Sequence, residues 1–218
     1  MIAAFNRTTD VTTELKLALN GSAGLRLFTA EEYQRLAEIG ILGEDDRVEL
    51  IEGRIVQMAA KNLKRAMATK RVNRFFSRKL ADSVIVSAQD PILLNNLSEP
   101  EPDIVLVKPP DERYIENHPQ PEDIFLVLEI ADSSLPYDRD VKCPLFARNG
   151  IIQFCLLNLQ TRELEDYRDP SPNGYRSKKP TPKMRVSTLS PFRNCQLRSK
   201  TCFRQSKQNR NERKSDYT

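Results

Sequence analysis

Two acidic residues of the sequence stand where hydrolytic chemistry would need them, at the ends of apolar segments. Glu129 lies near the end of the segment Ile124–Ile130, and Asp103 begins the segment Asp103–Val107. A carboxylate is costly to bury without a partner, so Glu129 requires water at a strand end, a cation or a metal ion. Taken alone, each residue also has a plainer explanation, Glu129 as an exposed strand-edge residue and Asp103 as an ordinary turn or strand cap.

Asp103 and Glu129 could form one site if their segments are neighbouring strands, because the two side chains would then converge at one end of a sheet. Two carboxylates in one cleft repel each other unless a divalent cation lies between them. Mg²⁺ prefers oxygen ligands and keeps several of its waters. We therefore expect Asp103 and Glu129 to be metal ligands and catalytic residues, with Mg²⁺ as the cofactor and the main-chain carbonyl of Ile130 as a further ligand.

Lys142 and Glu49 are the other two candidate catalytic residues. Lys142 follows the Glu129 strand in a predicted helix, where an ammonium facing the acidic cleft would orient the attacking water or stabilise an oxyanion. Glu49, in a predicted hairpin, would complete the acidic cluster. Plainer explanations remain open here too, because Lys142 fits a solvated helix lysine and Glu49 fits a surface cross-strand pair with Arg54.

A long basic segment offers a surface for a polyanionic substrate. The sequence from Lys61 to Leu80 predicts a helix in which eight of twenty residues are Lys or Arg and none is acidic. Such a helix would contact the phosphates of a nucleic acid, although a run of charge is more often simply a solvated face. Together with the acidic residues, it predicts metal-assisted phosphodiester hydrolysis, in which the cation polarises the phosphate and activates a bound water.

Composition argues against several other kinds of protein. The chain of 218 residues has a single histidine, His118, with no nucleophile's setting around it, which does not support a Ser–His–Asp or Cys–His mechanism. Its seven glycines form no phosphate-binding motif, and its four cysteines show no CxxC spacing, so neither a nucleotide-binding loop nor a zinc site is expected. No apolar run reaches membrane-spanning length and no signal-peptide pattern is present, so we expect a cytoplasmic protein without membrane contact.

The elements that must position these residues alternate between helix and strand. Thr29 and Glu32 fit a capping box for a helix that ends at Gly40, and β-rich runs flank Glu52-Gly53 as in a hairpin over Arg47–Met58. The elements predicted after the hairpin are a helix at 61–80, strands at 84–94, 103–107 and 124–130, a helix at 137–149, and strands at 151–159 and 163–168. This order predicts an α/β (α+β) fold with a mixed central sheet and helices on its faces.

Six stretches of the sequence, in this order, resemble one known family. They are LFTAEEYQRL, EDDRVELIEGRIVQMA, VSAQDPILL, SEPEPDIVLV, HPQPEDIFLVLEIADSSLPYDRDVKCPLFARNGI and LEDYRDPSPNGYR. Over residues 25–176 the chain resembles the bacterial "putative restriction endonuclease" family, a former domain of unknown function in the PD-(D/E)XK nuclease superfamily. The resemblance implies a restriction-endonuclease-like core and Mg²⁺-dependent cleavage of DNA.

The resemblance also implies roles for the four candidate residues. Asp103, which follows Pro102, matches the family's PD, and Glu129 matches the acidic residue of its second motif. Glu49 matches the acidic residue of the hairpin, and Lys142 matches a lysine on the helix that follows.

The chain divides by charge into an acidic part and a basic tail. Residues 176–218 carry 13 Lys and Arg against two Asp and Glu, whereas residues 1–175 carry 21 against 28. From Lys178 on, no helix or strand period survives, as is typical of disordered segments. We expect a mobile leader at 1–25, a restriction-endonuclease-like nuclease domain at 26–176, and a basic tail at 177–218 that is disordered, loosely docked or degenerate.

The chain departs from the family pattern at two positions. Ala131 stands two residues after Glu129 in place of a lysine, and Arg65 stands where family members often carry a histidine. Arg65 and the basic tail, which also departs from the family pattern, favour a second hypothesis, a catalytically impaired nuclease-fold protein that binds nucleic acid or a protein partner. A third hypothesis is that the basic tail alone binds any polyanion. Under the leading hypothesis, a DNA endonuclease, a homodimer is one expectation because enzymes that cut both strands of a duplex often dimerise.

Overall fold

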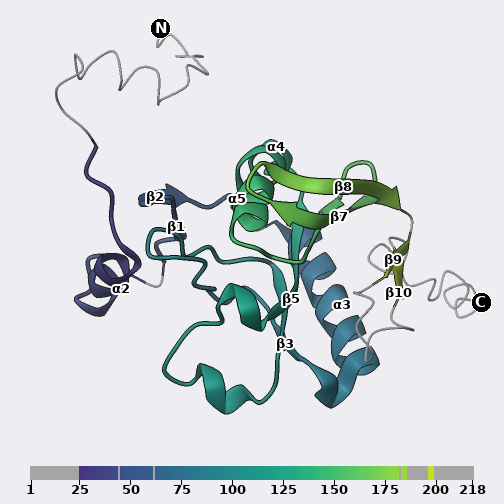
Figure 1. Ribbon diagram of the computed structural model, residues 1–218, viewed down its shortest axis with the longest axis horizontal. Helices are drawn as coiled ribbons and strands as arrows, with labels where there is room; N and C mark the ends of the chain where they lie inside the picture. The colour runs from purple at the N-terminus through teal and green to yellow at the C-terminus, as the bar shows by residue number, and fades with distance from the viewer. Residues whose placement is uncertain (1–24, 44, 61, 182, 186–195, 199–218) are drawn as a thin grey trace, which may run out of the picture.

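A six-stranded mixed sheet forms the centre of the computed structural model, and helices lie against both of its faces (Figure 1). The structure describes residues 25–43, 45–60, 62–181, 183–185 and 196–198. The strands of this sheet, in spatial order, are β3 (Ile85–Ser87), β4 (Ile104–Val107), β5 (Ile124–Ala131), β6 (Gln153–Asn158), β7 (Glu163–Ser171) and β8 (Gly174–Thr181). β5 and β6 are parallel, and the other neighbours are antiparallel. The predicted α/β (α+β) class with a mixed central sheet is confirmed.

The central strands are apolar because both faces of the sheet are covered. Every residue of β4 and β6 is buried, and so is all of β5 except the partly buried Phe125. Such nearly continuous apolar strands are typical of sheets with a layer on each side. One core lies between the sheet and α3 (Leu63–Leu80), and the other lies between the sheet and α5 (Cys143–Arg148).

The N-terminal elements form as their local sequence dictates. Helix α2 (Ala30–Glu38) begins with the predicted capping box, in which Thr29 and Glu32 bind each other's backbone N–H groups. Strands β1 (Val48–Ile51) and β2 (Arg54–Gln57) form the predicted hairpin. Its two turn residues both have positive φ, 48° at Glu52 and 76° at Gly53, as the two-residue turn of a hairpin requires.

The helix predicted over 61–80 is present as α3, and it lies along one face of the sheet (Figure 1). Its first turn is capped by Asn62, whose side chain accepts a hydrogen bond from the backbone N–H of Arg65. Residue 61, where the predicted helix starts, lies outside the described residues. The buried face of α3 consists of Arg65, Ala68, Thr69, Val72, Phe76 and Leu80. Arg65 is therefore the one charged residue of α3 that is turned into the protein.

The connection from β5 to β6 is interrupted, whereas the sequence predicted one helix over 137–149. It consists of α4 (Leu135–Tyr137), a π-helical turn η4 (Asp138–Lys142) and α5. The backbone N–H of Cys143 donates to the carbonyl of Asp138, which is the i to i+5 bond of a π-helix. Pro144 follows directly and has no N–H to donate, so the regular ladder cannot run through this point.

Two further boundaries differ from the predicted ones. The strand predicted over 84–94 is only β3, and residues 88–94 have no regular structure. At the other end, β7 and β8 form a long hairpin that reaches Thr181, because β8 pairs with β7 along its whole length. The prediction that no structure survives after Lys178 is therefore wrong for 178–181 and for the short pair β9 (Lys183–Arg185) and β10 (Gln196–Arg198). The predicted leader up to residue 24 and most of the predicted tail lie outside the described residues.

The other elements among the described residues are three short 3₁₀ helices, η1 (Ala81–Ser83), η2 (Asp111–Tyr114) and η3 (Pro121–Asp123). Within the described ranges, no helix has the length and apolar character needed to cross a membrane.

Candidate active site

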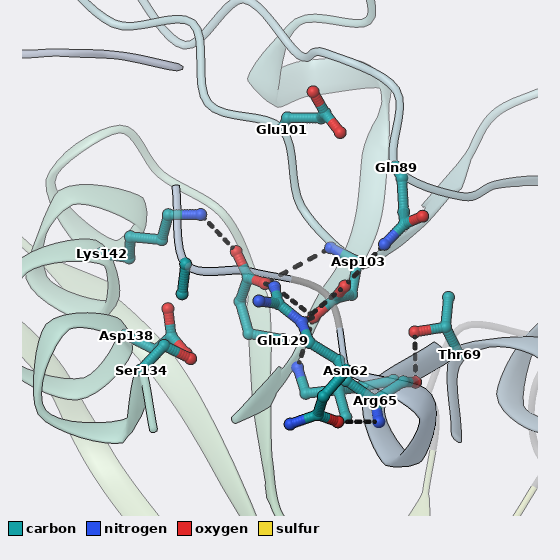
Figure 2. Close-up of polar contacts among 12 residues, drawn as sticks. Asn62, Arg65, Thr69, Gln89, Glu101, Asp103, Glu129, Ser134, Asp138 and Lys142 are labelled. Carbon is teal, nitrogen blue, oxygen red and sulfur yellow. Dashed lines mark hydrogen bonds and ion pairs between the residues drawn. The ribbon is translucent and has the colours of Figure 1, made fainter. Parts of the chain in front are cut away.

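Asp103 and Glu129 meet at one end of neighbouring strands. β4 and β5 pair with Ile104 opposite Leu128, so Asp103, immediately before β4, lies opposite Glu129. The backbone N–H of Asp103 donates to Glu129 Oε2 at 3.3 Å, and the N–H of Ile130 donates to Asp103 Oδ2 at 2.9 Å (Figure 2). Both carboxylates are buried, with 1% and 0% exposed. The predicted convergence of the two side chains therefore occurs, while their roles as metal ligands stay a prediction.

Lys142 joins the acidic pair to Glu49. Its Nζ lies 2.8 Å from Glu129 Oε1 and 2.8 Å from Glu49 Oε2, and only 2% of the residue is exposed. Lys142 is thus not a solvated helix lysine. The surface pair between Glu49 and Arg54 does not form either, because Glu49 lies opposite Val56 in the hairpin and is itself buried.

The hairpin is held against the sheet by its backbone, which fixes the position of Glu49. Leu50 and Glu99 exchange two backbone hydrogen bonds, of 3.2 and 2.8 Å, and so connect β1 to the segment that leads into β4. The N–H of Glu101 in that segment donates to Glu49 Oε2 at 3.2 Å. All four candidate residues are therefore gathered in one cluster, which we call the acidic cluster: Glu49, Asp103, Glu129 and Lys142.

Burial and mutual charge oppose each other in the acidic cluster. Burial raises the pKa of Glu129, and the ammonium of Lys142 partly opposes this effect. Burial alone would lower the pKa of Lys142, but Glu129 first, and then Glu49 and Asp138, outweigh it and raise the pKa. The raised pKa favours the ammonium form of Lys142, and two of its three donors are already engaged by carboxylates.

Arg65 adds a second buried cation to the acidic cluster, from the first turn of α3. Its guanidinium donates to both oxygens of Asp103, with Nε at 3.2 and 3.1 Å from Oδ1 and Oδ2 and Nη2 at 2.9 Å from Oδ2 (Figure 2). Nη2 also lies 3.9 Å from Glu129 Oε2. Gln89 donates to Asp103 Oδ1 at 3.2 Å, so both oxygens of this carboxylate are fully engaged. Burial would lower the pKa of Arg65, but Asp103, together with Glu129 and Asp138, outweighs burial and raises it.

A pocket of about 210 Å³ opens beside the acidic cluster. Its lining includes the charged residues Glu49, Arg65 and Lys142, together with the segment Val56–Ala59, which begins in β2 and continues past its end. The crossover contributes Ser134, Tyr137 and Asp138. The hydroxyl of Tyr137 is buried and has no hydrogen-bond partner in the described part of the chain, whereas Asp138 accepts a hydrogen bond from Ser134 at 2.6 Å.

The donor atoms of the acidic cluster have the chemistry that a divalent cation requires. Counting Asp138, four carboxyl groups face two cations, Lys142 and Arg65, which leaves a surplus of two negative charges when all four carboxyls are ionised. Mg²⁺ is commonly bound through one or two carboxylates and several waters, and Asp103 and Glu129 are a pair of this kind. No three His, Cys, Asp or Glu side chains among the described residues form a metal-binding group, so the pair and water would have to suffice.

The comparisons with known proteins agree with this architecture. An aspartate and a glutamate on neighbouring strands of a mixed sheet, with a lysine against them, are consistent with a nuclease of the PD-(D/E)XK type. Residues 30–199 match the model of the Uma2 family, which is described as "Putative restriction endonuclease", and the chain belongs to this family.

A solved structure shows the same fold. It is described as "a putative nuclease belonging to DUF820" from Anabaena variabilis, and it superposes with a TM-score of 0.63 at 16% sequence identity. The superposition covers 81% of this chain and 97% of the other. No curated protein matches the chain.

Four residues around the acidic cluster were not among the sequence candidates. Asp138 lies four positions before Lys142, a spacing that places two helical residues on one side and was a usable signal. Tyr137 and Gln89 offered no such signal, since one lies in the irregular crossover and the other in a loop. Arg65 was noted only as a departure from the family pattern, and its contact with Asp103 depends on where α3 packs.

Proposed function

We propose that this protein is a Mg²⁺-dependent DNA endonuclease that hydrolyses phosphodiester bonds. The observation that carries the proposal is the joined pair of buried carboxylates, Asp103 and Glu129, with the ammonium of Lys142 at 2.8 Å from Glu129. Asp103 and Glu129 would hold the ion. When bound, the ion would polarise the phosphate and lower the pKa of a bound water.

The chain's own residues have distinct tasks in this proposal. Lys142, which lines the pocket with a donor to spare, stabilises the negative charge that develops on the phosphate oxygens. Glu49 keeps that ammonium in place from the side opposite Glu129. A water gives up a proton as its oxygen bonds to the phosphorus, the bond from phosphorus to the leaving oxygen breaks, and the leaving oxygen takes up a proton, so that the elements of water are added across the broken bond.

DNA is the substrate that the exposed face of α3 favours. Its exposed basic residues make no ion pair with the described residues, and α3 contains no acidic residue. They are Lys64, Lys70, Arg74, Arg78 and Lys79. Because Arg65 in the first turn of the same helix contacts Asp103, a DNA backbone bound along α3 would extend toward the acidic cluster. We further propose a cytoplasmic protein that acts as a homodimer when it cuts both strands.

A plasmid-nicking assay with and without Mg²⁺ tests the proposal. The purified full chain should convert supercoiled plasmid to nicked or linear forms only with Mg²⁺, and Asp103→Asn should bind DNA as before without cutting it. A wild-type protein that binds DNA and never cuts under any divalent metal would refute the proposal.

One observation favours a second function, that of a nuclease-fold protein that binds nucleic acid without cutting it. Arg65 already neutralises Asp103 through three hydrogen bonds, so the carboxylate pair is satisfied as it stands. Under this alternative, wild type and Asp103→Asn would bind the plasmid equally, and neither would cut it.

A further inference from the structure

The side chain of Arg65 lies where a cation would have to bind Asp103. Arg65 is 6% exposed, and its backbone is fixed on both sides, by the Asn62 side chain at its N–H and by the Thr69 hydroxyl at its carbonyl. The guanidinium contacts both oxygens of Asp103 and comes within 3.9 Å of Glu129. A fork of this kind, between a charged donor and a carboxylate, is among the stronger hydrogen-bonded pairs in proteins.

The two other donors to Asp103 are a backbone N–H, which the sheet holds in place, and a neutral side-chain amide. The N–H of Ile130 belongs to β5 and is fixed by the sheet. Gln89 is neutral and lies on a loop. Of the groups that donate hydrogen bonds to Asp103, Arg65 therefore carries the positive charge, and it would repel a divalent ion that binds this carboxylate.

We propose that Arg65 competes with the divalent ion for the carboxylate pair, so that it sets the ion concentration at which the site fills. This inference rests on the proposed function, because it concerns the same two carboxylates. Arg65 also keeps Asp103 paired when no ion is bound, which explains how a buried carboxylate pair is stable in the metal-free protein. Removing the guanidinium leaves Asp103 free for the ion and removes the repulsion by Arg65, while Lys142 stays on Glu129.

Calorimetric titration of the metal-free protein with Mg²⁺ and with Mn²⁺ tests this competition. Arg65→Gln and Arg65→Ala should lower the dissociation constant by about tenfold or more, which corresponds to about 1.4 kcal/mol. Arg113→Ala is the matched control, since it removes an arginine that pairs with Asp123 outside the acidic cluster, and it should bind metal as wild type does. An unchanged or weaker affinity in Arg65→Gln would overturn the competition.

A second measurement guards against a variant that fails to fold. If Arg65→Ala is unfolded without metal, the thermal midpoint of Arg65→Gln decides the matter, and Mg²⁺ should raise it more than it raises that of wild type. An equal rise would overturn the competition. Failure of the inference is distinct from failure of the proposed function: a wild type that cuts DNA, with unchanged affinity in Arg65→Gln, refutes only the competition. Tighter binding in that variant, without cleavage by any form, refutes only the nuclease.

Discussion

At the scale of single residues, the site is a set of buried charges that depend on one another. Lys142 contacts Glu129 and Glu49 at 2.8 Å each, and all three residues are at most 2% exposed. A buried ion pair contributes little net stability compared with apolar residues, but removal of one partner leaves an uncompensated charge. The cluster therefore tolerates the loss of one charge poorly.

Lys142→Met should be strongly destabilising for this reason. We expect its free energy of unfolding to fall by about 3–5 kcal/mol, as is typical when one partner of a buried pair is removed. Lys70→Met, at an exposed position of α3, should stay within about 0.5 kcal/mol of wild type. Denaturant unfolding followed by circular dichroism measures both, and equal stability of the two variants would contradict the account of the buried ammonium.

Tyr137→Phe should separate activity from stability. The hydroxyl has no hydrogen-bond partner in the described part of the chain and lines the pocket, so its removal should change the free energy of unfolding by no more than about 0.5 kcal/mol. We expect the cleavage rate to fall, because Tyr137 lines the pocket beside the acidic cluster and its hydroxyl is the polar group that the substitution removes there. A variant with full cleavage activity would show that this hydroxyl does not take part.

At the scale of the elements, three connections converge on the acidic cluster. β4 and β5 bring Asp103 and Glu129 together, the β1–β2 hairpin adds Glu49, and the π-helical turn adds Lys142. Helix α3 contributes Arg65 from its buried face and presents its other basic residues to solvent. The same helix thus serves both the site and its charged surface.

The exposed face of α3 should govern affinity for DNA and its dependence on salt. The variant Lys70→Ala/Arg74→Ala/Arg78→Ala should bind duplex DNA more weakly, and the slope of log affinity against log salt should become shallower by about 0.9 for each phosphate that the variant no longer neutralises. Arg35→Ala on α2 is the control and should leave the slope unchanged. Fluorescence anisotropy at several salt concentrations gives both slopes, and an unchanged slope in the triple variant would place the DNA elsewhere.

Local sequence rules predicted the elements whose structure is decided locally. The capping box at Thr29, the hairpin at Glu52-Gly53 and the buried strand from Ile124 formed as expected. The interrupted crossover was not predicted, because a π-turn depends on how Pro144 and the packing of its neighbours act together. Strand β8 was not predicted because most of its residues are polar, and its pairing with β7 makes them a strand.

The acidic cluster was predictable in part. The setting of Asp103 and Glu129 in apolar strands indicated a shared site, and the structure places them together. The contact between Arg65 and Asp103 spans 38 positions and depends on the packing of α3 against the sheet, which no local pattern reports.

At the scale of the whole molecule, the sheet separates two cores that each hold one buried thiol. Cys155 lies in the core beneath α3, and Cys143 lies in the core beneath α5. Burial raises the pKa of Cys143 to about 12 and raises that of Cys155 well above its ordinary value. Both thiols therefore stay protonated in the folded protein at pH values where they ionise in the unfolded chain.

Stability should fall as the solution becomes alkaline because of these thiols. Above about pH 8.5, unfolding releases a proton from each, so the free energy of unfolding decreases by about 1.4 kcal/mol per pH unit for each thiol. The double variant Cys143→Ser/Cys155→Ala should show a flatter dependence over the same range. Denaturant unfolding at a series of pH values measures the slopes, and parallel curves for the two proteins would contradict the prediction.

The central claim is that Asp103 and Glu129 together hold the ion that drives DNA cleavage. The most direct test is the rate of plasmid cleavage by wild type and by Glu129→Gln over a titration of Mg²⁺, with circular dichroism confirming that both are folded. We predict that the wild-type rate rises and saturates with Mg²⁺, while the rate of Glu129→Gln stays at background throughout. A Glu129→Gln protein that reaches the wild-type rate at the same Mg²⁺ concentrations would contradict the account.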